Sequence, residues 1–266
     1  KLSLLLGTRI TNWDRDGTGY WDSDESSESK GVLTPYAGLV YKITDNLSTY
    51  ASYTTSFSPQ SYIDENAQYV DPSEGINYEI GLKTALFDDK LNASVSLFKT
   101  KQDNVAKYAG TLADGTSRSY YTLEDGVTTK GFEFELSGRI TDNLDGTLGY
   151  TQLTIKDSED KDTQTYIPKK IAKAMLTYRP DFIKGLKLGA SANWKDSTEI
   201  SYWYGSAQQK SYAIYDLMAN YQINKNLKAS LNINNITDKK YYGSLIKPYI
   251  TYGEPRSFGA SLEYKF

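Results

Sequence analysis

Histidine and cysteine are both absent from the 266 residues, so the side chains that could do chemistry are carboxylates, hydroxyls and lysines. A Ser-His-carboxylate triad, a cysteine nucleophile and metal sites built on imidazole or thiolate are therefore unavailable. Glu133 and Glu135 form a carboxylate pair on one face of a predicted strand, where Arg139 or a lysine from a neighbouring strand can pair with them. We therefore predict no catalytic residue, no enzyme activity and no cofactor.

An acidic segment between Trp13 and Ser29 is the other candidate for chemistry. Its carboxylates are Asp14, Asp16, Asp22, Asp24, Glu25 and Glu28. The segment lacks the ordered ligand spacing of an EF-hand calcium loop. We interpret it as a solvated acidic loop and expect no metal.

Apolar side chains occupy every second position in the last residues of the chain. Phe258, Leu262, Tyr264 and Phe266 share one face of a predicted strand, and polar or small residues occupy the other face. The same alternation recurs between Leu186 and Lys195, where lysines and asparagine stand opposite large apolar groups. This period of two is typical of a β-strand with one apolar and one polar face.

Alternation of this kind fits either a membrane-spanning β-barrel or a soluble β-sandwich. The chain has 24 Tyr, 8 Phe and 4 Trp, and many of them fall near predicted strand ends, where membrane interfaces favour aromatic rings. No apolar run approaches the roughly 18 residues of a transmembrane helix. These features favour the barrel, and the sandwich remains an alternative.

We predict one all-β domain over residues 1–266, a transmembrane antiparallel up-and-down barrel of about twelve strands. The predicted strands are Leu2–Trp13, Gly31–Ile43, Leu47–Phe57, Ile76–Phe87, Leu91–Val105, Ser119–Ile140, Leu144–Ile155, Tyr166–Tyr178, Leu186–Lys195, Ser211–Ile223, Leu227–Ile236 and Ile250–Phe266. Short turns alternate with long loops, which predicts short periplasmic turns and long extracellular loops. The even count would let the first strand pair with the last, so that the barrel closes.

The polar positions of the alternation predict the side chains that line the lumen. They are Arg9, Lys42, Glu79, Lys83, Glu133, Glu135, Arg139, Lys173, Arg179, Lys187, Lys195, Asp216, Lys228, Glu263 and Lys265. Basic groups outnumber acidic groups in this set. A narrow, charged lumen with a mild preference for anions is the prediction that follows.

Several segments resemble the carboxy-terminal barrel half of TonB-dependent siderophore receptors, and within that family the receptors for ferric coprogen and rhodotorulic acid. They include NYEIGLKTALFDDKLNASVSLFKTKQDNVA (77–106), LNINNITDKKYY (231–242) and YGEPRSFGASLEYKF (252–266). The resemblance implies a Gram-negative outer-membrane location, reached after removal of a leader. It also makes the aromatic side chains Tyr62, Tyr108, Trp203 and Tyr204 candidates for relics of a ligand site, although packing within loops or at the membrane interface is the interpretation that we favour for them.

Members of that family carry a plug domain and a TonB box ahead of a wider barrel, and the sequence shows neither. We therefore expect a passive pore or scaffold, of engineered minimal design, with lipid or detergent around it. On this view neither a ferric siderophore nor TonB is a partner. We also expect no nucleic-acid partner, because the net charge of −3 removes the case for a globally basic nucleic-acid binder. The barrel assembly machinery is the expected protein partner, through Phe258, Leu262, Tyr264 and Phe266. The alternative is a receptor fragment that binds or transports its ligand only with its missing half.

Overall fold

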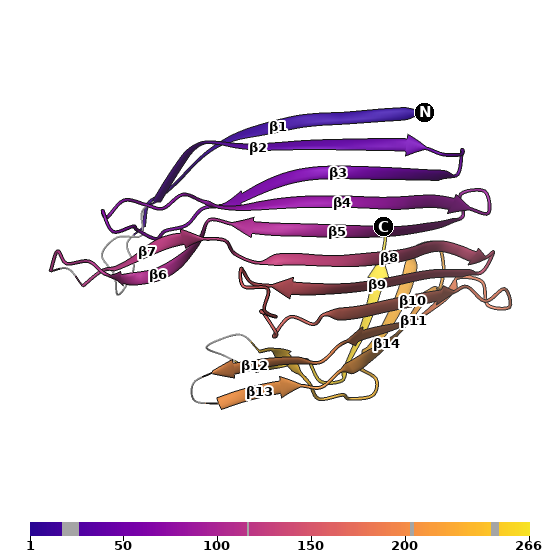
Figure 1. Cartoon of the computed structure of the whole chain (residues 1–266). Coiled ribbons are helices and arrows are strands. Elements are labelled where there is room, and N and C mark those ends of the chain that lie inside the picture. The colour runs from indigo at the N-terminus through magenta and orange to yellow at the C-terminus, as the bar shows by residue number, and fades with distance from the viewer. Residues whose placement is uncertain (18–26, 116, 203–204, 246–249) are drawn as a thin grey trace.

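The computed structural model describes residues 1–17, 27–115, 117–202, 205–245 and 250–266. Almost all of this chain is β-strand, arranged around one large sheet (Figure 1). In the described ranges, no helix has the length and apolar character needed to cross a membrane.

The large sheet has twelve antiparallel strands, which follow one another in chain order from edge to edge. They are β1 (Leu2–Arg15), β2 (Ser27–Lys42), β3 (Leu47–Ser58), β4 (Ser73–Leu86), β5 (Leu91–Asp103), β8 (Thr128–Thr141), β9 (Leu144–Lys156), β10 (Lys170–Tyr178), β11 (Leu186–Lys195), β14 (Tyr212–Gln222), β15 (Leu227–Asn234) and β18 (Ser257–Tyr264). The predicted all-β meander of about twelve strands is confirmed. Its alternation of short turns with longer connections is visible in Figure 1, where the short turns lie at the right.

Three further strand pairs lie in the long connections and were not predicted. They are β6 (Val105–Thr111) with β7 (Ser119–Glu124), β12 (Thr198–Tyr202) with β13 (Gly205–Gln209), and β16 (Tyr242–Ser244) with β17 (Thr251–Tyr252). The first two project from the end of the sheet opposite the short turns (Figure 1). The alternating pattern continues into these hairpins, so it does not reveal where the main sheet ends.

Two predicted strands are therefore wrong in extent. The stretch 119–140 is divided between β7 and β8 by a break at Asp125 and Gly126, where Gly126 N–H donates to the carbonyl of Gln102 at 2.9 Å. A β-carbon at Gly126 would lie 2.5 Å from Val105 Cγ2, so a larger residue at this corner would force Val105 to move. The stretch 250–266 breaks before β18 at Pro255, which has no N–H to donate to a strand ladder.

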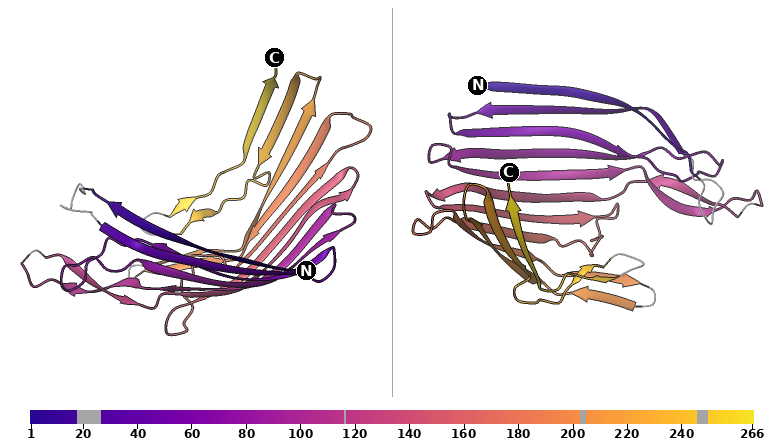
Figure 2. Two further views of the ribbon diagram at one scale, coloured as in Figure 1. Left: turned by 90° about the horizontal axis from the view of Figure 1, so that it is seen from above. Right: turned by 180° about the vertical axis from the view of Figure 1, so that it is seen from behind.

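The sheet does not close on itself in the described residues. β1 and β18 are its two edges, and no register joins them. Figure 2 shows an open, curved sheet with the first and last strands on separate rims. The expected pairing of the first strand with the last is wrong for this structure, because the curved sheet leaves β1 and β18 on separate rims.

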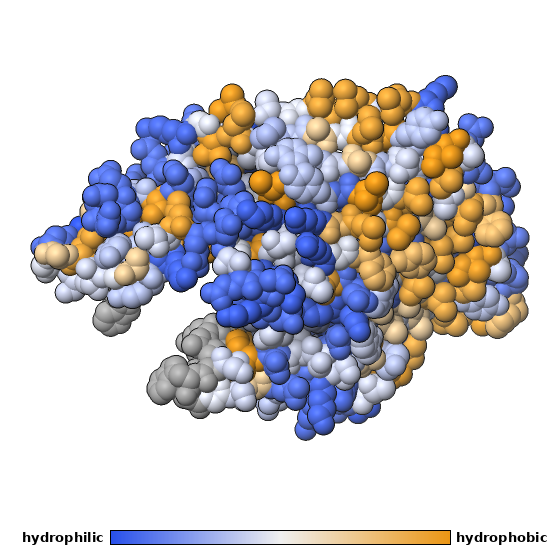
Figure 3. All heavy atoms as spheres, viewed as in Figure 1, coloured by the Kyte–Doolittle hydropathy of each residue, from blue (hydrophilic) through white to orange (hydrophobic). Residues whose placement is uncertain are grey.

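The register divides the sheet into two faces. One row of paired residues on the apolar face runs Leu39, Ala51, Ile80 and Leu97 across β2 to β5. Large apolar side chains on this face are exposed, with 55% of Ile80 and 60% of Leu97 accessible. No second sheet covers them within the described residues, which excludes the β-sandwich alternative. Figure 3 shows apolar residues gathered over the strands between polar ends.

Candidate functional site

The opposite, polar face of the sheet carries the charged side chains that we predicted for a lumen. Those within the strands all share this face by register, and Arg179 and Lys265 directly follow β10 and β18. One row across five neighbouring strands runs Lys42, Ser48, Lys83, Ser94 and Glu135. That these side chains line an aqueous lumen stays a prediction.

A hollow of about 390 Å³ lies along this row, close to the short turns, and Lys42, Lys83 and Glu135 are among its lining residues. Beside it the hydroxyl of Tyr50 donates a hydrogen bond to Glu79, and Lys83 Nζ lies 4.7 Å from the centre of the Tyr50 ring. The charges on this part of the face are thus partly compensated by neighbours on adjacent strands. The polar face is a charged surface whose side chains contact one another across neighbouring strands.

Gly81 and Gly149 provide a matched test of this packing, since both lie on the polar face. A β-carbon at Gly81 would lie 2.5 Å from the Tyr50 ring, whereas nothing lies within 4 Å of a β-carbon at Gly149. We expect Gly81→Val to lower the free energy of unfolding by about 1–3 kcal/mol, because the ring must leave Glu79 and Lys83. Gly149→Val is expected to change it little. Denaturant titration in detergent micelles measures both, and equal effects would contradict this account.

Ion pairs on the polar face differ from those expected. Glu133 and Glu135 form no ion pair in the part of the chain that the structure describes, and Glu133 accepts a hydrogen bond from Thr151 Oγ1 at 3.4 Å. Arg179 instead pairs with Asp145, with 2.6 Å between Nη2 and Oδ2. Sequence analysis missed Asp145, because only the β9–β10 register brings it to the end of β10.

The loop end of the sheet brings Tyr62 and Tyr108 together through a third ring. Tyr121, in β7, lies 4.4 Å from the ring of Tyr62 and 6.1 Å from that of Tyr108 between ring centroids. Tyr62 and Tyr108 keep 44% and 60% of their surface exposed. The two other predicted aromatics, Trp203 and Tyr204, lie outside the described residues, as do Asp22, Asp24 and Glu25 of the acidic segment. We call Tyr62, Tyr108 and Tyr121 the tyrosine cluster.

Hydrogen bonds to backbone carbonyls hold the loop around the tyrosine cluster in place. Tyr121 N–H donates to the carbonyl of Ile63 at 2.8 Å, and Gln60 Nε2 donates to the carbonyl of Asn104 at 2.7 Å. Backbone N–H groups of Gln68 and Asn66 donate to the carboxylate of Asp64 and lower its pKa. The loop before β4 is thereby fastened to the β6–β7 hairpin. The spacing of residues in the sequence gives no indication that Gln60 and Tyr121 take part in these contacts.

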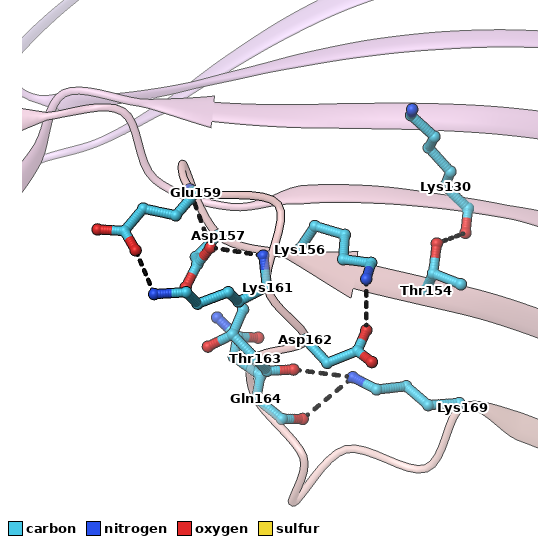
Figure 4. Close-up of polar contacts among 10 residues, drawn as sticks. All are labelled: Lys130, Thr154, Lys156, Asp157, Glu159, Lys161, Asp162, Thr163, Gln164 and Lys169. Atoms are coloured by element: carbon cyan, nitrogen blue, oxygen red, sulfur yellow. Dashed lines mark hydrogen bonds and ion pairs between the residues drawn. The ribbon is translucent and has the colours of Figure 1, made fainter.

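The connection between β9 and β10 is an ordered loop of polar contacts (Figure 4). The Asp157 carboxylate accepts from the N–H groups of Glu159 and Lys161, and Lys156 pairs with Asp162 at 3.1 Å. Lys169 Nζ donates to the carbonyls of Thr163 and Gln164 at 3.1 and 3.2 Å, and burial lowers its pKa. These bonds leave most carboxylates of the loop facing solvent, and no group of three metal-ligating side chains occurs in the described residues.

Comparison with known proteins identifies the family. The family model described as TonB dependent receptor-like, beta-barrel, matches residues 1–236. The chain belongs to this family of TonB-dependent receptor barrels. Its members are Gram-negative outer-membrane receptors that transport rather than catalyse, which confirms the expected location and the expected lack of enzyme activity.

Relatives of this receptor barrel include ferric-pyoverdine receptors. The chain is 36% identical over 272 residues to the ferric-pyoverdine BN7/BN8 receptor of Pseudomonas putida, and 32% identical over 278 residues to the ferripyoverdine receptor of Pseudomonas aeruginosa. Both alignments cover 100% of the chain but only 32% and 34% of the relatives, so the chain spans about a third of their length. The expected likeness to coprogen receptors is therefore wrong in this detail, and the engineered origin stays a prediction.

Solved structures agree with this membership of the receptor family. The crystal structure of the Pseudomonas aeruginosa ferripyoverdine receptor bound to ferripyoverdine superposes with a TM-score of 0.85 and 31% identity, over 100% of this chain and 36% of that one. The FpvAI–pyocin S2 complex superposes with a TM-score of 0.89 and 31% identity, over 100% of this chain and 37% of that one. The open, curved sheet is thus the shape of a part of a receptor barrel.

The LNINNITDKKYY segment (231–242) of this receptor barrel holds the connection between β15 and β18 through hydrogen bonds of Asn235. Asn235, only 3% exposed, donates through Nδ2 to the carbonyls of Lys239 and Glu254 and accepts through Oδ1 from Lys239 N–H at 2.8 Å. Asp216 on β14 accepts from Asn235 N–H at 2.9 Å and from Ser191 Oγ at 2.8 Å. The predicted lumen residue Asp216 thus also fastens the connection between β15 and β18.

The residues of the predicted assembly signal lie at the carboxy-terminal edge of the sheet. Phe258, Leu262 and Tyr264 share the apolar face of β18 and are 71%, 74% and 58% exposed. Phe266 follows the strand, and its ring lies 5.1 Å from that of Tyr264. Recognition of these side chains by the assembly machinery stays a prediction.

Proposed function

We propose that this chain forms part of the barrel wall of an outer-membrane receptor that imports a ferric siderophore of the pyoverdine class. The observation that carries the proposal is the alignment of the whole chain with ferric-pyoverdine receptors at 32% and 36% identity. This is the fragment alternative of the sequence analysis, and it replaces the passive pore as the favoured function.

The two open edges support this reading. In lipid every backbone N–H and C=O group must be paired, so β1 and β18 need further strands beside them. The sheet has twelve antiparallel strands, which is an even number. An even number of additional strands would therefore complete a closed antiparallel wall. A pore made by this chain alone would instead need a direct β1–β18 pairing.

In the proposed receptor the polar face lines the lumen and the tyrosine cluster stands at its outer mouth. Exposed tyrosine rings on a fixed framework are well suited to a large ligand, since they present apolar area and a hydroxyl at small entropic cost. The ligand contacts supplied by the remaining strands and loops would add to those of the cluster. Binding therefore needs the whole receptor.

Uptake of ⁵⁵Fe-labelled siderophore by cells that carry the intact receptor tests the function. We expect saturable uptake of a ferripyoverdine, lost when the receptor is deleted, and no comparable uptake of ferric coprogen. Uptake of ferric coprogen in place of every ferripyoverdine offered would overturn the proposed ligand class, and ion conductance without any uptake would restore the passive pore.

A substitution at the centre of the tyrosine cluster tests its role. Because Tyr121 contacts both other rings, we expect Tyr121→Ala to weaken siderophore binding by about tenfold or more, as for central aromatic residues of interfaces. Tyr121→Phe keeps the ring and should bind nearly as the parent does. Tyr178→Ala is the control, because it removes a tyrosine ring from the short-turn end of the apolar face and should leave siderophore binding unchanged. Equal binding by Tyr121→Ala and the parent, at equal receptor abundance, would remove the cluster from the ligand site.

A further inference from the structure

A hollow of about 270 Å³ lies at the base of the β12–β13 hairpin, where β11 ends and β14 begins. Four segments contribute to its lining: the β9–β10 loop, the β11–β12 junction, the β13–β14 junction, and β16 with the residue after it. The register pairs Lys195 with Tyr212, which places this part of the lining on the polar face. The lining includes Tyr166, Pro168, Lys195, Asp196, Tyr212 and Leu245.

Hydrogen bonds between these segments fix the walls of the hollow. Thr165 Oγ1 donates to the carbonyl of Glu199 at 2.8 Å, and Glu199 N–H donates to the carbonyl of Thr165 at 3.1 Å. These two bonds join the β9–β10 loop to β12. Tyr242 N–H donates to Gln209 Oε1 at 2.8 Å, which joins β16 to β13. The hollow is therefore formed before any ligand arrives, as is usual for small-molecule sites.

Tyrosine rings and one leucine give the hollow its apolar surface. Tyr212 and Leu245 are only 8% and 4% exposed, and the ring of Tyr212 stacks on that of Tyr241 with 4.6 Å between the centroids. Tyr166 and Tyr242 add two more rings to the lining. Aromatic and aliphatic surface around a hollow of this volume suits the apolar body of a small molecule.

The hollow also carries two opposite charges that do not pair with each other. Lys195 and Asp196 both belong to its lining, and neither forms an ion pair in the part of the chain that the structure describes. Asp196 Oδ1 accepts from Ser197 N–H at 2.8 Å, and this bond holds the carboxylate in place. A ligand with one charge of each sign would compensate both groups, whereas a ligand with a single charge would be repelled by one of them.

We propose that this hollow binds a free α-amino acid with a large apolar side chain. The carboxylate of the ligand lies at Lys195, its ammonium group lies at Asp196, and its side chain lies against the tyrosine rings. This site goes beyond the proposed siderophore import and is separate from the tyrosine cluster. The β6–β7 hairpin of that cluster leaves the sheet between β5 and β8, whereas the β12–β13 hairpin leaves it between β11 and β14 (Figure 1).

Saturation-transfer NMR titrations of the intact receptor in detergent micelles test the site with three probes that share a phenyl ring. L-Phenylalanine carries both charges, 3-phenylpropionate carries only the carboxylate, and 2-phenylethylamine carries only the ammonium group. We expect L-phenylalanine to bind at least about tenfold more tightly than either analogue, because each analogue loses one charge-assisted hydrogen bond. Equal binding of all three probes would overturn the assignment of the two charges.

Substitutions at the two charged residues test each contact separately. Lys195→Gln should weaken the binding of L-phenylalanine and 3-phenylpropionate by about tenfold and leave 2-phenylethylamine unchanged. Asp196→Asn should weaken L-phenylalanine and 2-phenylethylamine and leave 3-phenylpropionate unchanged. Lys187→Gln is the matched control, because it removes a lysine from the polar face of the same strand but outside the hollow.

A third substitution, Thr198→Phe, fills the hollow with a ring and should abolish the binding of all three probes. Undiminished binding by this variant, or no saturable binding of L-phenylalanine to the parent, would overturn the proposed site. An equal loss in Lys187→Gln and Lys195→Gln would show a general effect of charge and would remove Lys195 from the site.

Discussion

Replacing Leu148 with arginine is expected to lower the free energy of unfolding in a bilayer by about 2–4 kcal/mol, the destabilisation typical of arginine on the lipid face of barrels near the midplane. Leu148 lies on the apolar face of β9, where its register partners are Leu136 and Ala174, and 41% of its surface is exposed. In lipid this position offers no water and no counter-charge to a guanidinium. The substitution should therefore reduce the amount of folded receptor in the membrane.

Thr147→Arg is the matched control, because Thr147 is the neighbouring residue on the polar face. Its register partners are Ser137 and Met175, and we expect the polar face to accept another cation. Urea titration of receptor folded into liposomes, followed by heat-modifiable electrophoresis, compares the two. A smaller loss for Leu148→Arg than for Thr147→Arg would reverse the assignment of the two faces.

Asn235→Ala is expected to have the second large effect, a loss of about 2–4 kcal/mol in the free energy of unfolding. The substitution removes two donated hydrogen bonds and one accepted bond in a buried site, and it leaves the carbonyls of Lys239 and Glu254 and the N–H of Lys239 without their partner. Each buried polar group left unpaired costs about 1–3 kcal/mol, with partial relief from entering water. Limited proteolysis should detect the loosened connection between β15 and β18, while denaturant titration measures the free energy.

Asn234→Ala provides the comparison one residue away. Asn234 donates a single exposed hydrogen bond to Ser257 Oγ at 3.1 Å, so its removal should cost no more than about 1 kcal/mol. If the two alanine variants unfold at the same denaturant concentration, the buried network around Asn235 does not hold the connection. Asp216→Ala should act in the same direction as Asn235→Ala, since it removes the acceptor for Asn235 N–H.

The strands of the main sheet were predictable because their signal is local. β11 occupies Leu186–Lys195, which are the predicted bounds, and β3, β5 and β9 begin at the predicted residues. Because side chains alternate with a period of two, the sequence indicates which residues share a face. The residue types of tight turns indicate where a strand must end. The charged positions share the polar face for the same reason.

The hairpins and the loop contacts were not predictable in this way. β6 and β7 continue the alternation of the main strands, and their position beside the loop before β4 depends on contacts such as Tyr121 with Tyr62. The pairing of Arg179 with Asp145 likewise follows from the strand register rather than from spacing along the chain. Such contacts join residues far apart in sequence, and many alternative partners satisfy the same local pattern.

The sequence by itself determined an all-β meander, the order of its strands and the division between an apolar and a polar face, because each depends on neighbours along one strand or across one turn. Only the tertiary structure decided that β1 and β18 stay apart, that three tyrosines meet at the loop end, and that Asn235 fastens the β15–β18 connection. Closure depends on the tilt and stagger summed over all strands, and loop packing depends on which distant segments meet. Neither quantity is contained in any single stretch of the chain.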